Sequence, residues 1–478
     1  MRHVGFRGVT AIALGLFGAS CAHGAANAPE SSTGHSANAG ATATSSSEAT
    51  AATVGTKSRP LPFIEDDYAR ALAEAKSKNK PLFVDGWATW CHSCLSLKSY
   101  VLNAPEMRAE ADKFVWLSLD SEKDKNAPYF TKFGLDALPT LWVIDPQTEQ
   151  VSWKLVGALT APELAAALEG VVDKNAKPGE AETLFAEATR ADARKDPASA
   201  ARLYEKVLTV APRNWGRRAE TVAAYVTALS AAKQAERCGE VASREAPTLP
   251  VNSYRVTIAA VGAGCVQGEP QGSAARAYLA PLTKELTGIV RSTGTPILAD
   301  DRSGAFDELI SALKADGKKS EAKQMAGEWA AFLEGEAQRA PDAKGRAVFD
   351  AHRMLAYVEL GEPARAIPMF TQTERDFPDD YNPAARLSRT YFELKRYDEA
   401  LDAASRAIAK AYGPRKLRLY QLKADIAGAK KDAAAERKTL DEALTFAGTV
   451  SLREGYEKLR TSLAERRAKL GSAPTAQR

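Results

Sequence analysis

The sequence predicts a small α/β domain near the N-terminus, followed by a long all-α region. Short apolar and β-branched runs, such as residues 80–85 and 114–119, are typical of buried strands. Beyond Lys177 the composition shifts to Ala, Leu, Glu, Lys and Arg at helical spacing, and strand-like runs become rare. Between the first two strands lies Trp90-Cys91-His92-Ser93-Cys94, whose two cysteines indicate the chemistry of the α/β domain.

The elements of the α/β domain are expected in a β-α-β and then a β-β-α order. Apolar residues at helical spacing follow the two cysteines, and a loop that contains Pro139 leads into a later strand. Asp145-Pro146 predicts a hairpin turn. The expected elements are strands at 80–85, 114–119, 141–144 and 150–155, a tight connection at 86–90, a helix that begins at the cysteines, and a closing helix at 162–172.

Two cysteines at positions i and i+3 of a first helical turn can close a small disulfide ring. The leading sulfur, that of Cys91, then lies at the positive end of the helix, which favours the thiolate over the thiol. The thiolate is the nucleophile of disulfide exchange, and Cys94 is near enough to resolve a mixed disulfide. The spacing by itself also fits half of a zinc site or a static structural disulfide. Zinc is disfavoured because the chain has no second C-x-x-C or His-x-x-x-His motif.

Two separated motifs carry a family resemblance. Residues 84–94, Val-Asp-Gly-Trp-Ala-Thr-Trp-Cys-His-Ser-Cys, resemble the active-site segment of the thioredoxin superfamily, and residues 133–140, which contain Pro139, resemble its cis-proline loop. Within the superfamily the segment is most similar to the C-terminal periplasmic domain of thiol:disulfide interchange reductases. The resemblance covers residues 61–175 and implies a thioredoxin fold there.

The resemblance also implies catalytic roles. Cys91 would be the attacking thiol, Cys94 the resolving thiol, and Asp85 the buried carboxylate that manages the proton of Cys94. The family often places a lysine in the strand beside this acid, whereas Trp116-Leu117-Ser118 supplies none. Without that partner, burial should raise the pKa of Asp85. The alternative for Asp85 is a turn residue at the end of its strand.

The same resemblance implies how substrate is bound. Trp90, Leu138 and Pro139 would contact it, with Pro139 as a cis proline that presents backbone to a substrate strand; a trans loop proline is the alternative. The dipeptide His92-Ser93 would tune the redox potential, with His92 either acting as a cation beside the Cys91 thiolate or pointing into solvent. No cofactor or metal is expected, because the Cys91–Cys94 disulfide itself carries two electrons.

The N-terminus predicts export. Arg2 and Arg7 precede a short apolar run and the small residues Gly18-Ala19-Ser20, the pattern of a signal peptide at residues 1–20. Cys21 follows directly and resembles the lipidated cysteine of bacterial lipoproteins; ordinary cleavage nearby is the alternative. Residues 21–60 are rich in Ala, Ser, Thr and Gly and predict a disordered tether. We therefore expect a periplasmic lipoprotein of a Gram-negative bacterium, held at the membrane by its lipid.

Two further cysteines lie in the helical region. Without a lipidated Cys21 the chain keeps an even number of cysteines, so Cys238 and Cys265 are expected to form a structural disulfide between successive helices. Two separate buried thiols are the alternative.

The helical region carries a repeat. Ala366, Ala400 and Ala434 are spaced 34 residues apart in small-residue helical contexts, a period that resembles the tetratricopeptide repeat. We expect helical repeats at 176–345, tetratricopeptide-like repeats at 346–447 and a C-terminal helix and tail at 448–478, together an all-α solenoid. Arg386 and other charged residues of these repeats are interpreted as a solvated face rather than a binding groove.

Together these patterns predict an exported thiol-disulfide oxidoreductase that reduces protein disulfides. The expected partners are protein thiols and disulfides, a membrane electron donor of the interchange-reductase type, and a protein or peptide on the helical repeats. A net charge of +4 on 478 residues is too small to indicate nucleic acid. The alternatives are an oxidase or isomerase of the same fold, and a scaffold protein whose thioredoxin domain is not catalytic.

Overall fold

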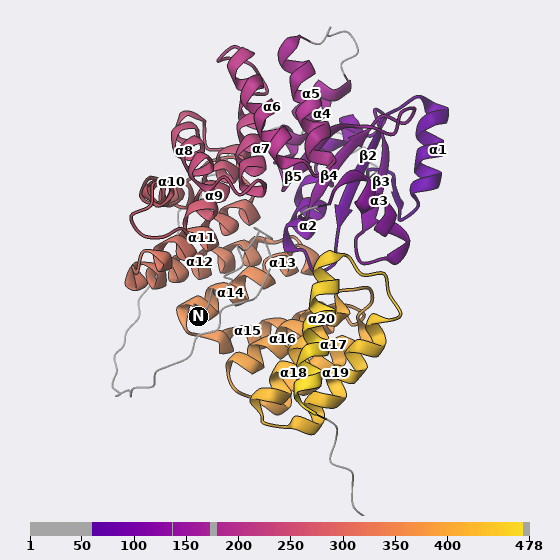
Figure 1. Ribbon diagram of the computed structural model, residues 1–478, viewed down its shortest axis with the longest axis vertical. Coiled ribbons are helices and arrows are strands. Elements are labelled where there is room, and N and C mark those ends of the chain that lie inside the picture. Colours follow the sequence, from indigo (N-terminus) through magenta and orange to yellow (C-terminus); the bar gives the residue numbers. More distant parts are fainter. Residues whose placement is uncertain (1–59, 136, 173–178, 472–478) are drawn as a thin grey trace, which may run out of the picture.

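The computed structural model describes residues 60–135, 137–172 and 179–471. The expected signal peptide, the lipidation site Cys21 and nearly all of the tether lie outside these residues. The described chain has a β-sheet domain followed by a long succession of helices, so both expected fold classes are confirmed (Figure 1). None of the helices in the described ranges combines the length and the apolarity needed to cross a membrane.

The α/β domain is built on one five-stranded mixed sheet in the order β1-β3-β2-β4-β5. β3 lies parallel to both β1 and β2, whereas β4 is antiparallel to both β2 and β5. The strands are β1 (Phe63–Glu65), β2 (Leu82–Trp87), β3 (Val115–Asp120), β4 (Thr140–Ile144) and β5 (Val151–Val156).

Helices cover both faces of this sheet, which is why the central strands β2, β3 and β4 are almost entirely buried. Phe83 and the residues that share its face pack under η1, η2 and α4, whereas Leu82 and Val84 pack under α1 and α3. The helical elements of the domain are α1 (Tyr68–Lys78), α2 (His92–Ser96), the π-helix η1 (Leu97–Val101), the 3₁₀ helices η2 (Pro105–Glu110) and η3 (Asp124–Asn126), α3 (Ala127–Phe133) and α4 (Ala161–Val172).

The sequence interpretation missed part of this domain. The strand β1 and the helices α1 and α3 were not expected, and β2 continues to Trp87 instead of ending at Asp85. β2 is longer because its pairing with β3 extends to Trp87 opposite Asp120. Gly86 permits this, since a Cβ atom at that position would lie 2.6 Å from the Trp142 ring of the neighbouring strand.

The helical region runs from α5 to α20, and its helices pack mainly against their neighbours in the chain. Its α-helices are α5 (Glu180–Ala193), α6 (Pro197–Val210), α7 (Arg218–Ala231), α8 (Ala235–Glu245), α9 (Ser253–Val266), α10 (Leu279–Arg291), α11 (Ala299–Ala315), α12 (Lys319–Arg339), α13 (Ala343–Ala347), α14 (Asp350–Leu360), α15 (Ala366–Asp376), α16 (Asn382–Glu393), α17 (Tyr397–Lys410), α18 (Lys416–Ala429), α19 (Ala433–Ala447) and α20 (Glu454–Lys469). Short 3₁₀ helices are η4 (Ala246–Thr248), η5 (Ala275–Tyr278) and η6 (Pro363–Arg365).

The repeat markers occupy equivalent places only in the first two units. Ala366 and Ala400 are fully buried, whereas Ala434 is exposed. Ala366 is the fourth residue counted from the start of η6, and Ala400 is the fourth residue of α17. In the third unit the fourth residue of α19 is Glu436, not Ala434. Glu436 is buried because its carboxylate accepts a hydrogen bond from Arg466 of α20 at 2.7 Å. The third unit is therefore displaced by two residues relative to the expected period.

The helical region bends around the α/β domain (Figure 1). At its start α5 packs against β5, and Glu220 of α7 accepts a hydrogen bond from Trp153 Nε1 at 2.7 Å. Farther along, α11 contacts α2, and residues near α18 reach the loop that follows β3. The helices therefore contact the α/β domain at several points far apart in the sequence, including the end of β2 where the cysteines lie.

Candidate active site

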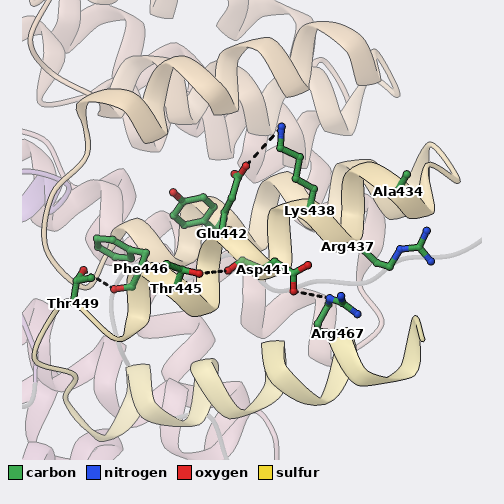
Figure 2. A pocket seen from close by; sticks show the side chains of 10 residues that line it. Ala434, Arg437, Lys438, Asp441, Glu442, Thr445, Phe446, Thr449 and Arg467 are labelled. Atoms are coloured by element: carbon green, nitrogen blue, oxygen red, sulfur yellow. Dashed lines mark hydrogen bonds and ion pairs between the residues drawn. The ribbon is translucent and has the colours of Figure 1, made fainter. Parts of the chain in front are cut away.

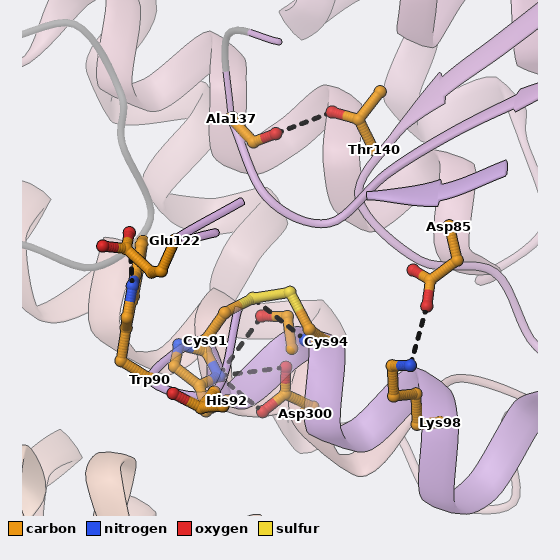
Figure 3. Close-up of a disulfide and its surroundings, with 12 residues drawn as sticks. Asp85, Trp90, Cys91, His92, Cys94, Lys98, Glu122, Ala137, Thr140 and Asp300 are labelled. Atoms are coloured by element: carbon orange, nitrogen blue, oxygen red, sulfur yellow. Dashed lines mark hydrogen bonds and ion pairs between the residues drawn. A yellow bond between two sulfur atoms is a disulfide. The ribbon is translucent and has the colours of Figure 1, made fainter. Parts of the chain in front are cut away.

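Cys91 and Cys94 form a disulfide at the start of α2, directly after β2 (Figure 3). Cys91 is the N-cap residue of this helix, and its Sγ accepts a hydrogen bond from the Cys94 backbone N–H at 3.1 Å. Once the disulfide is reduced, this N–H and the helix end would stabilise a Cys91 thiolate. The disulfide is nevertheless covered in this structure, because Cys91 is 5 % exposed and Cys94 is 1 % exposed.

The loop before β4 lies against the disulfide. The Leu138–Pro139 peptide bond is cis, and Leu138 packs against the cluster formed by Ala88, Cys91 and Cys94. The Thr140 hydroxyl donates a hydrogen bond to the Ala137 carbonyl at 2.6 Å, which ties this loop to the start of β4 (Figure 3). Residues 138 and 139 thus come from a different part of the chain than the cysteines and share one site with them.

Asp85 is a fully buried carboxyl in β2, and the prediction that it lacks a lysine partner is wrong. Lys98 Nζ lies 3.2 Å from Asp85 Oδ2 and also donates a hydrogen bond to Ser118 Oγ at 2.7 Å. The lysine comes from η1, at the end of the helical segment that starts at the cysteines, and not from a strand. Burial raises the pKa of Asp85, and the Lys98 ammonium opposes that rise.

His92 points into the protein interior. Its Nδ1 lies 2.9 Å from Asp300 Oδ1 and 3.2 Å from Asp300 Oδ2, and the Ser93 hydroxyl is 3.2 Å from the same nitrogen. The His92 ring also lies against the ring of His352, with 3.8 Å between their centroids. Asp300 belongs to α11 and His352 to α14, so the helical region supplies both neighbours.

Trp90 is held between the two domains. Its Nε1 donates a hydrogen bond to Glu122 Oε1 at 3.1 Å, and the Arg415 guanidinium lies 4.4 Å from the centre of its ring. Asn382 donates to the Thr89 carbonyl at 3.2 Å. Arg386 donates to the Trp90 carbonyl at 3.4 Å. Arg386 is therefore directed at the cysteine loop, and its interpretation as part of a solvated face is wrong.

A second contact joins the loop after β3 to the start of α18. The Tyr412 hydroxyl donates to Asp120 Oδ2 at 2.5 Å, and the Arg415 backbone N–H donates to Glu122 Oε2 at 2.6 Å. Burial raises the pKa of both carboxyls. Sequence reasoning did not identify Asp120, Glu122, Asp300, His352 or Asn382, because each acquires its role through contacts with residues that are distant in the sequence.

Among the described residues, His92, Asp300 and His352 form one group whose arrangement could hold a metal ion, with ligand atoms within 4.8 Å of one another. Two imidazoles and a carboxylate suit zinc or another first-row metal. The same atoms are also engaged by hydrogen bonds, since His352 Nδ1 lies 2.6 Å from the Ser303 hydroxyl, which in turn accepts from Trp329 Nε1.

The remaining cysteines and the surface pocket lie elsewhere. Cys238 of α8 and Cys265 of α9 form a second disulfide. A pocket on α19, between the neighbouring helices, is lined by charged side chains such as Asp441 and Arg467, which pair with each other at 2.7 Å (Figure 2). None of the residues that line this pocket is a cysteine, so the pocket is not part of the redox site.

Comparison with known proteins defines the class of both regions. Residues 64–146 match the thioredoxin-like family model, and residues 357–426 match the tetratricopeptide repeat model. The chain therefore has a thioredoxin-like domain with a Cys91–Cys94 pair, followed by a tetratricopeptide repeat region.

The curated relatives of the thioredoxin-like domain are thiol:disulfide interchange proteins. The chain is 32 % identical over 103 residues to DsbD of Cronobacter sakazakii, which is 21 % of this chain and 18 % of that protein. It is 26 % identical over 110 residues to DsbD of Pseudoalteromonas atlantica, or 22 % of this chain and 19 % of that protein. The chain thus spans about a fifth of the length of these relatives.

A solved structure was also found, the crystal structure of the APC/C hetero-tetramer Cut9-Hcn1. It covers 65 % of this chain and 54 % of that chain at 11 % identity and a TM-score of 0.29.

Proposed function

We propose that the chain is an exported protein-disulfide reductase that works by dithiol exchange through Cys91 and Cys94. The observation that carries the proposal is the position of Cys91 at the N-cap of α2, where its sulfur accepts the Cys94 N–H, beside the cis peptide at Pro139. This arrangement stabilises a thiolate on Cys91 and leaves Cys94 next to it. The partial relationship to DsbD supports reduction as the direction.

The exchange would proceed in two displacements. The Cys91 thiolate attacks one sulfur of a substrate disulfide, which forms a Cys91–substrate mixed disulfide and releases the other substrate sulfur as a thiolate. Deprotonated Cys94 then attacks Cys91 Sγ, releases the second substrate sulfur and closes the Cys91–Cys94 disulfide. Two electrons pass to the substrate, whose two thiolates take up protons. A dithiol donor must reduce the Cys91–Cys94 disulfide again before the next cycle.

Asp85 would take the proton of Cys94 before the second displacement. Burial raises the pKa of Asp85 above the ordinary value of a carboxyl, which makes it a stronger proton acceptor. Lys98 would keep the carboxyl from remaining permanently protonated, since its ammonium favours the ionised form.

Substrate access requires a change in the arrangement of the two domains. With Cys91 at 5 % exposure, a protein disulfide can reach its sulfur only after the contacts of Asn382, Arg386 and Arg415 with the cysteine loop have opened. Pro139 and Leu138 would then present the surface on which the substrate strand lies, and the tetratricopeptide repeats would bind a protein or peptide partner.

The proposed location follows from the N-terminal residues alone. Residues 1–20 would direct export, Cys21 would carry the lipid, and the segment up to residue 60 would let the domains reach partners away from a Gram-negative periplasmic membrane. A membrane protein of the interchange-reductase type would supply electrons.

The deciding experiment is a redox titration of the full chain in graded glutathione buffers, with the oxidation of Cys91 and Cys94 quantified by differential alkylation and mass spectrometry. A potential near about −270 mV, well below that of the glutathione couple, is expected for a reductase, whereas a value near about −120 mV would identify an oxidase. A pair that never titrates would leave only the scaffold alternative.

Two cysteine variants test the order of attack. Cys94→Ser is expected to accumulate mixed disulfides on Cys91, and Cys91→Ser is expected to form none and to lose all disulfide reduction. The matched control is the double variant Cys238→Ser/Cys265→Ser, which removes the other disulfide and should keep the activity. Equal trapping by both active-site variants would contradict the assignment of Cys91 as the attacking thiol.

A further inference from the structure

We propose that His92, Asp300 and His352 form a binding site for one first-row transition-metal ion, with zinc as the favoured ion, at the contact between the thioredoxin-like domain and the helical region. The proposal goes beyond the redox function, because metal binding can be measured on the oxidised chain whether or not its cysteines exchange disulfides. His92 comes from the start of α2, Asp300 from α11 and His352 from α14. A bound ion would therefore join the two parts of the chain.

The ligand atoms already lie close together. His92 Nδ1 is 2.9 Å from Asp300 Oδ1, although the two residues are 208 positions apart in the sequence, and Figure 3 shows the His92 ring facing the carboxylate. One nitrogen of His352 completes a set in which all three atoms lie within 4.8 Å of one another. Zinc bound tetrahedrally would hold neighbouring ligand atoms about 3.4 Å apart. Small side-chain movements would thus close the three residues around an ion.

The types of ligand favour zinc over calcium or magnesium. Two imidazoles and one carboxylate are ligands that zinc sites use, and three protein ligands leave a fourth position for water. Calcium and magnesium prefer oxygen ligands. To bind the ion through Nδ1, His92 gives up its hydrogen bond with Asp300 and carries its ring hydrogen on Nε2.

The site is buried, unlike the acidic clusters that are common on protein surfaces. His92 is 8 % exposed, Asp300 is 4 % exposed and His352 is 3 % exposed. Removing a carboxylate from water is costly unless hydrogen bonds and positive charge compensate the loss of hydration. A divalent cation between Asp300 and the two imidazoles would supply that charge.

Neighbouring side chains hold the His352 ring in place. The Ser303 hydroxyl lies 2.6 Å from His352 Nδ1 and accepts a hydrogen bond from Trp329 Nε1 at 2.6 Å. Both Ser303 and Trp329 are fully buried. Hydrogen-bonded neighbours of this kind orient the histidines that bind metals. The orientation of the His352 ring is therefore set by the fold before an ion arrives.

A metal at this position would control access to the redox pair. His92 lies between Cys91 and Cys94 in the sequence, and these cysteines are covered where α11 contacts α2. An ion that binds the three residues only in the closed arrangement stabilises that arrangement by mass action. This consequence rests on the proposed function: zinc would hold the reductase in a covered, inactive state.

Zinc binding by the oxidised full chain tests the site. The chain carries no histidine tag, Cys21 is alkylated beforehand, and the Cys91–Cys94 disulfide keeps both sulfurs from binding the ion as thiolates. Isothermal titration calorimetry is expected to show one tight site per chain. Its affinity should fall at least about tenfold in each of the variants His92→Gln, Asp300→Asn and His352→Gln.

The matched control is Glu359→Gln, which removes a carboxylate from the same pair of helices. Glu359 of α14 pairs with Lys314 of α11 at 2.9 Å, so this variant weakens the contact between the two helices without touching the three ligands. It should keep the affinity of wild type. The remaining histidines, His3, His23 and His35, are present in every variant, so any binding there is common to all.

Cobalt(II) supplies a readout on wild type that does not depend on whether the variants fold. Visible absorption bands of a four-coordinate or five-coordinate ion are expected, without a thiolate-to-cobalt band in the near ultraviolet, because the ligands are nitrogen and oxygen. A thiolate band, or the weak spectrum of octahedral cobalt, would overturn the assignment.

The second measurement is the rate at which a phosphine, TCEP, reduces the Cys91–Cys94 disulfide, followed by mass tagging of the two cysteines. Saturating zinc is expected to slow this rate about threefold or more in wild type and in Glu359→Gln. It should leave the rate unchanged in His352→Gln, which controls for zinc that the phosphine itself binds. Tight binding without any slowing would overturn the control of access.

The outcomes separate this inference from the proposed function. The absence of a tight site, or a site that all three ligand variants retain, would overturn the inference and leave the reductase proposal standing. Zinc binding as expected, in a chain whose cysteines never titrate with glutathione, would support the metal site and remove the reductase.

Discussion

At the scale of single residues, the buried carboxyl of Asp85 has a lysine partner, Lys98, that comes from a helix and not from the neighbouring strand. The strand beside Asp85 offers only the Ser118 hydroxyl, at 3.4 Å, so the cation arrives from η1 instead. Lys98 Nζ also lies 4.0 Å from the centre of the Trp87 ring. These contacts fix the lysine head group over the carboxyl.

We predict that Lys98→Met slows disulfide reduction at neutral pH by up to about tenfold and moves the pH profile of the reaction to higher pH. The reason is that Asp85, buried without its cation, stays protonated to higher pH. The variant should also lose about 1–3 kcal/mol of stability, because the buried carboxyl loses a hydrogen-bond partner. Stopped-flow reduction of a fluorescent disulfide across pH checks the profile, and Ser118→Ala, which removes the weaker contact, should change it less. An unshifted profile would separate Lys98 from the proton of Cys94.

The buried His352 should make the free energy of unfolding depend on pH. Burial and His92 lower its pKa from 6.5 to about 3, so between these values the unfolded chain binds more protons than the native one. Stability therefore falls as pH falls through this window. At pH 5 this histidine should cost about 2 kcal/mol relative to pH 7.5.

We expect His352→Gln to remove this loss, because glutamine does not titrate and can still meet the Ser303 hydroxyl. Urea unfolding of wild type and variant at both pH values, followed by tryptophan fluorescence, measures it. Parallel pH dependences would show that the native ring is already charged. Glu328→Gln, which removes an exposed ion pair with Arg291 in the same helical region, is the control and should show the pH dependence of wild type.

At the scale of elements, the loop between α17 and α18 lies in close contact with the α/β domain. Gly413 has φ +63°, and a Cβ atom there would lie 2.1 Å from the Glu122 carbonyl. On either side of it, Tyr412 and Arg415 donate to Asp120 and Glu122. The loop can approach so closely only because this position has no side chain.

We predict that Gly413→Ala opens the domain contact and raises the rate at which reduced Cys91 is alkylated by a bulky maleimide several-fold. Gly361→Ala is the matched control, since Gly361 also has positive φ (+88°) but no atom near its missing Cβ. Both substitutions carry a backbone strain of about 1 kcal/mol, and only the first should change access to Cys91. Equal alkylation rates in the two variants would mean that this loop does not keep the cysteines covered.

At the scale of the whole molecule, the helical region bends around the thioredoxin-like domain. The stability of the helical region therefore matters for the contacts between the two. The Cys238–Cys265 disulfide joins α8 to α9 across 27 positions of sequence, in the part of the helical region that precedes α11. It lies apart from the active-site pair, so its contribution is to stability.

Cys238→Ser/Cys265→Ser is therefore expected to lower the free energy of unfolding by about 3–4 kcal/mol, mainly because the unfolded chain gains freedom. The reduction potential of the Cys91–Cys94 pair should stay unchanged. Thermal unfolding by circular dichroism, alongside the glutathione titration, checks both statements. An unfolding midpoint equal to that of wild type would show that this disulfide adds no stability.

The sequence by itself determined the features that depend on the spacing of residues close together in the chain. The cysteine pair, the proline loop that faces it and the helical composition after residue 177 predict both fold classes, because strand and helix periodicity and a three-residue cysteine spacing are local properties. The short strand β1 escaped prediction because three residues hold too little periodic signal. The third repeat is displaced because Ala400 and the equivalent Glu436 are 36 residues apart, two more than the expected period of 34.

Only the tertiary structure decided what surrounds the disulfide. The bend of the helical region brings Asp300 to His92 and Asn382 to the Thr89 carbonyl. The pairing of Lys98 with Asp85 instead joins η1 to β2 within the α/β domain. Polar and charged residues are common on every helix, and nothing in their local pattern marks the few that become buried. Contact across hundreds of residues is a property of the folded chain, because it depends on how all the intervening helices stack.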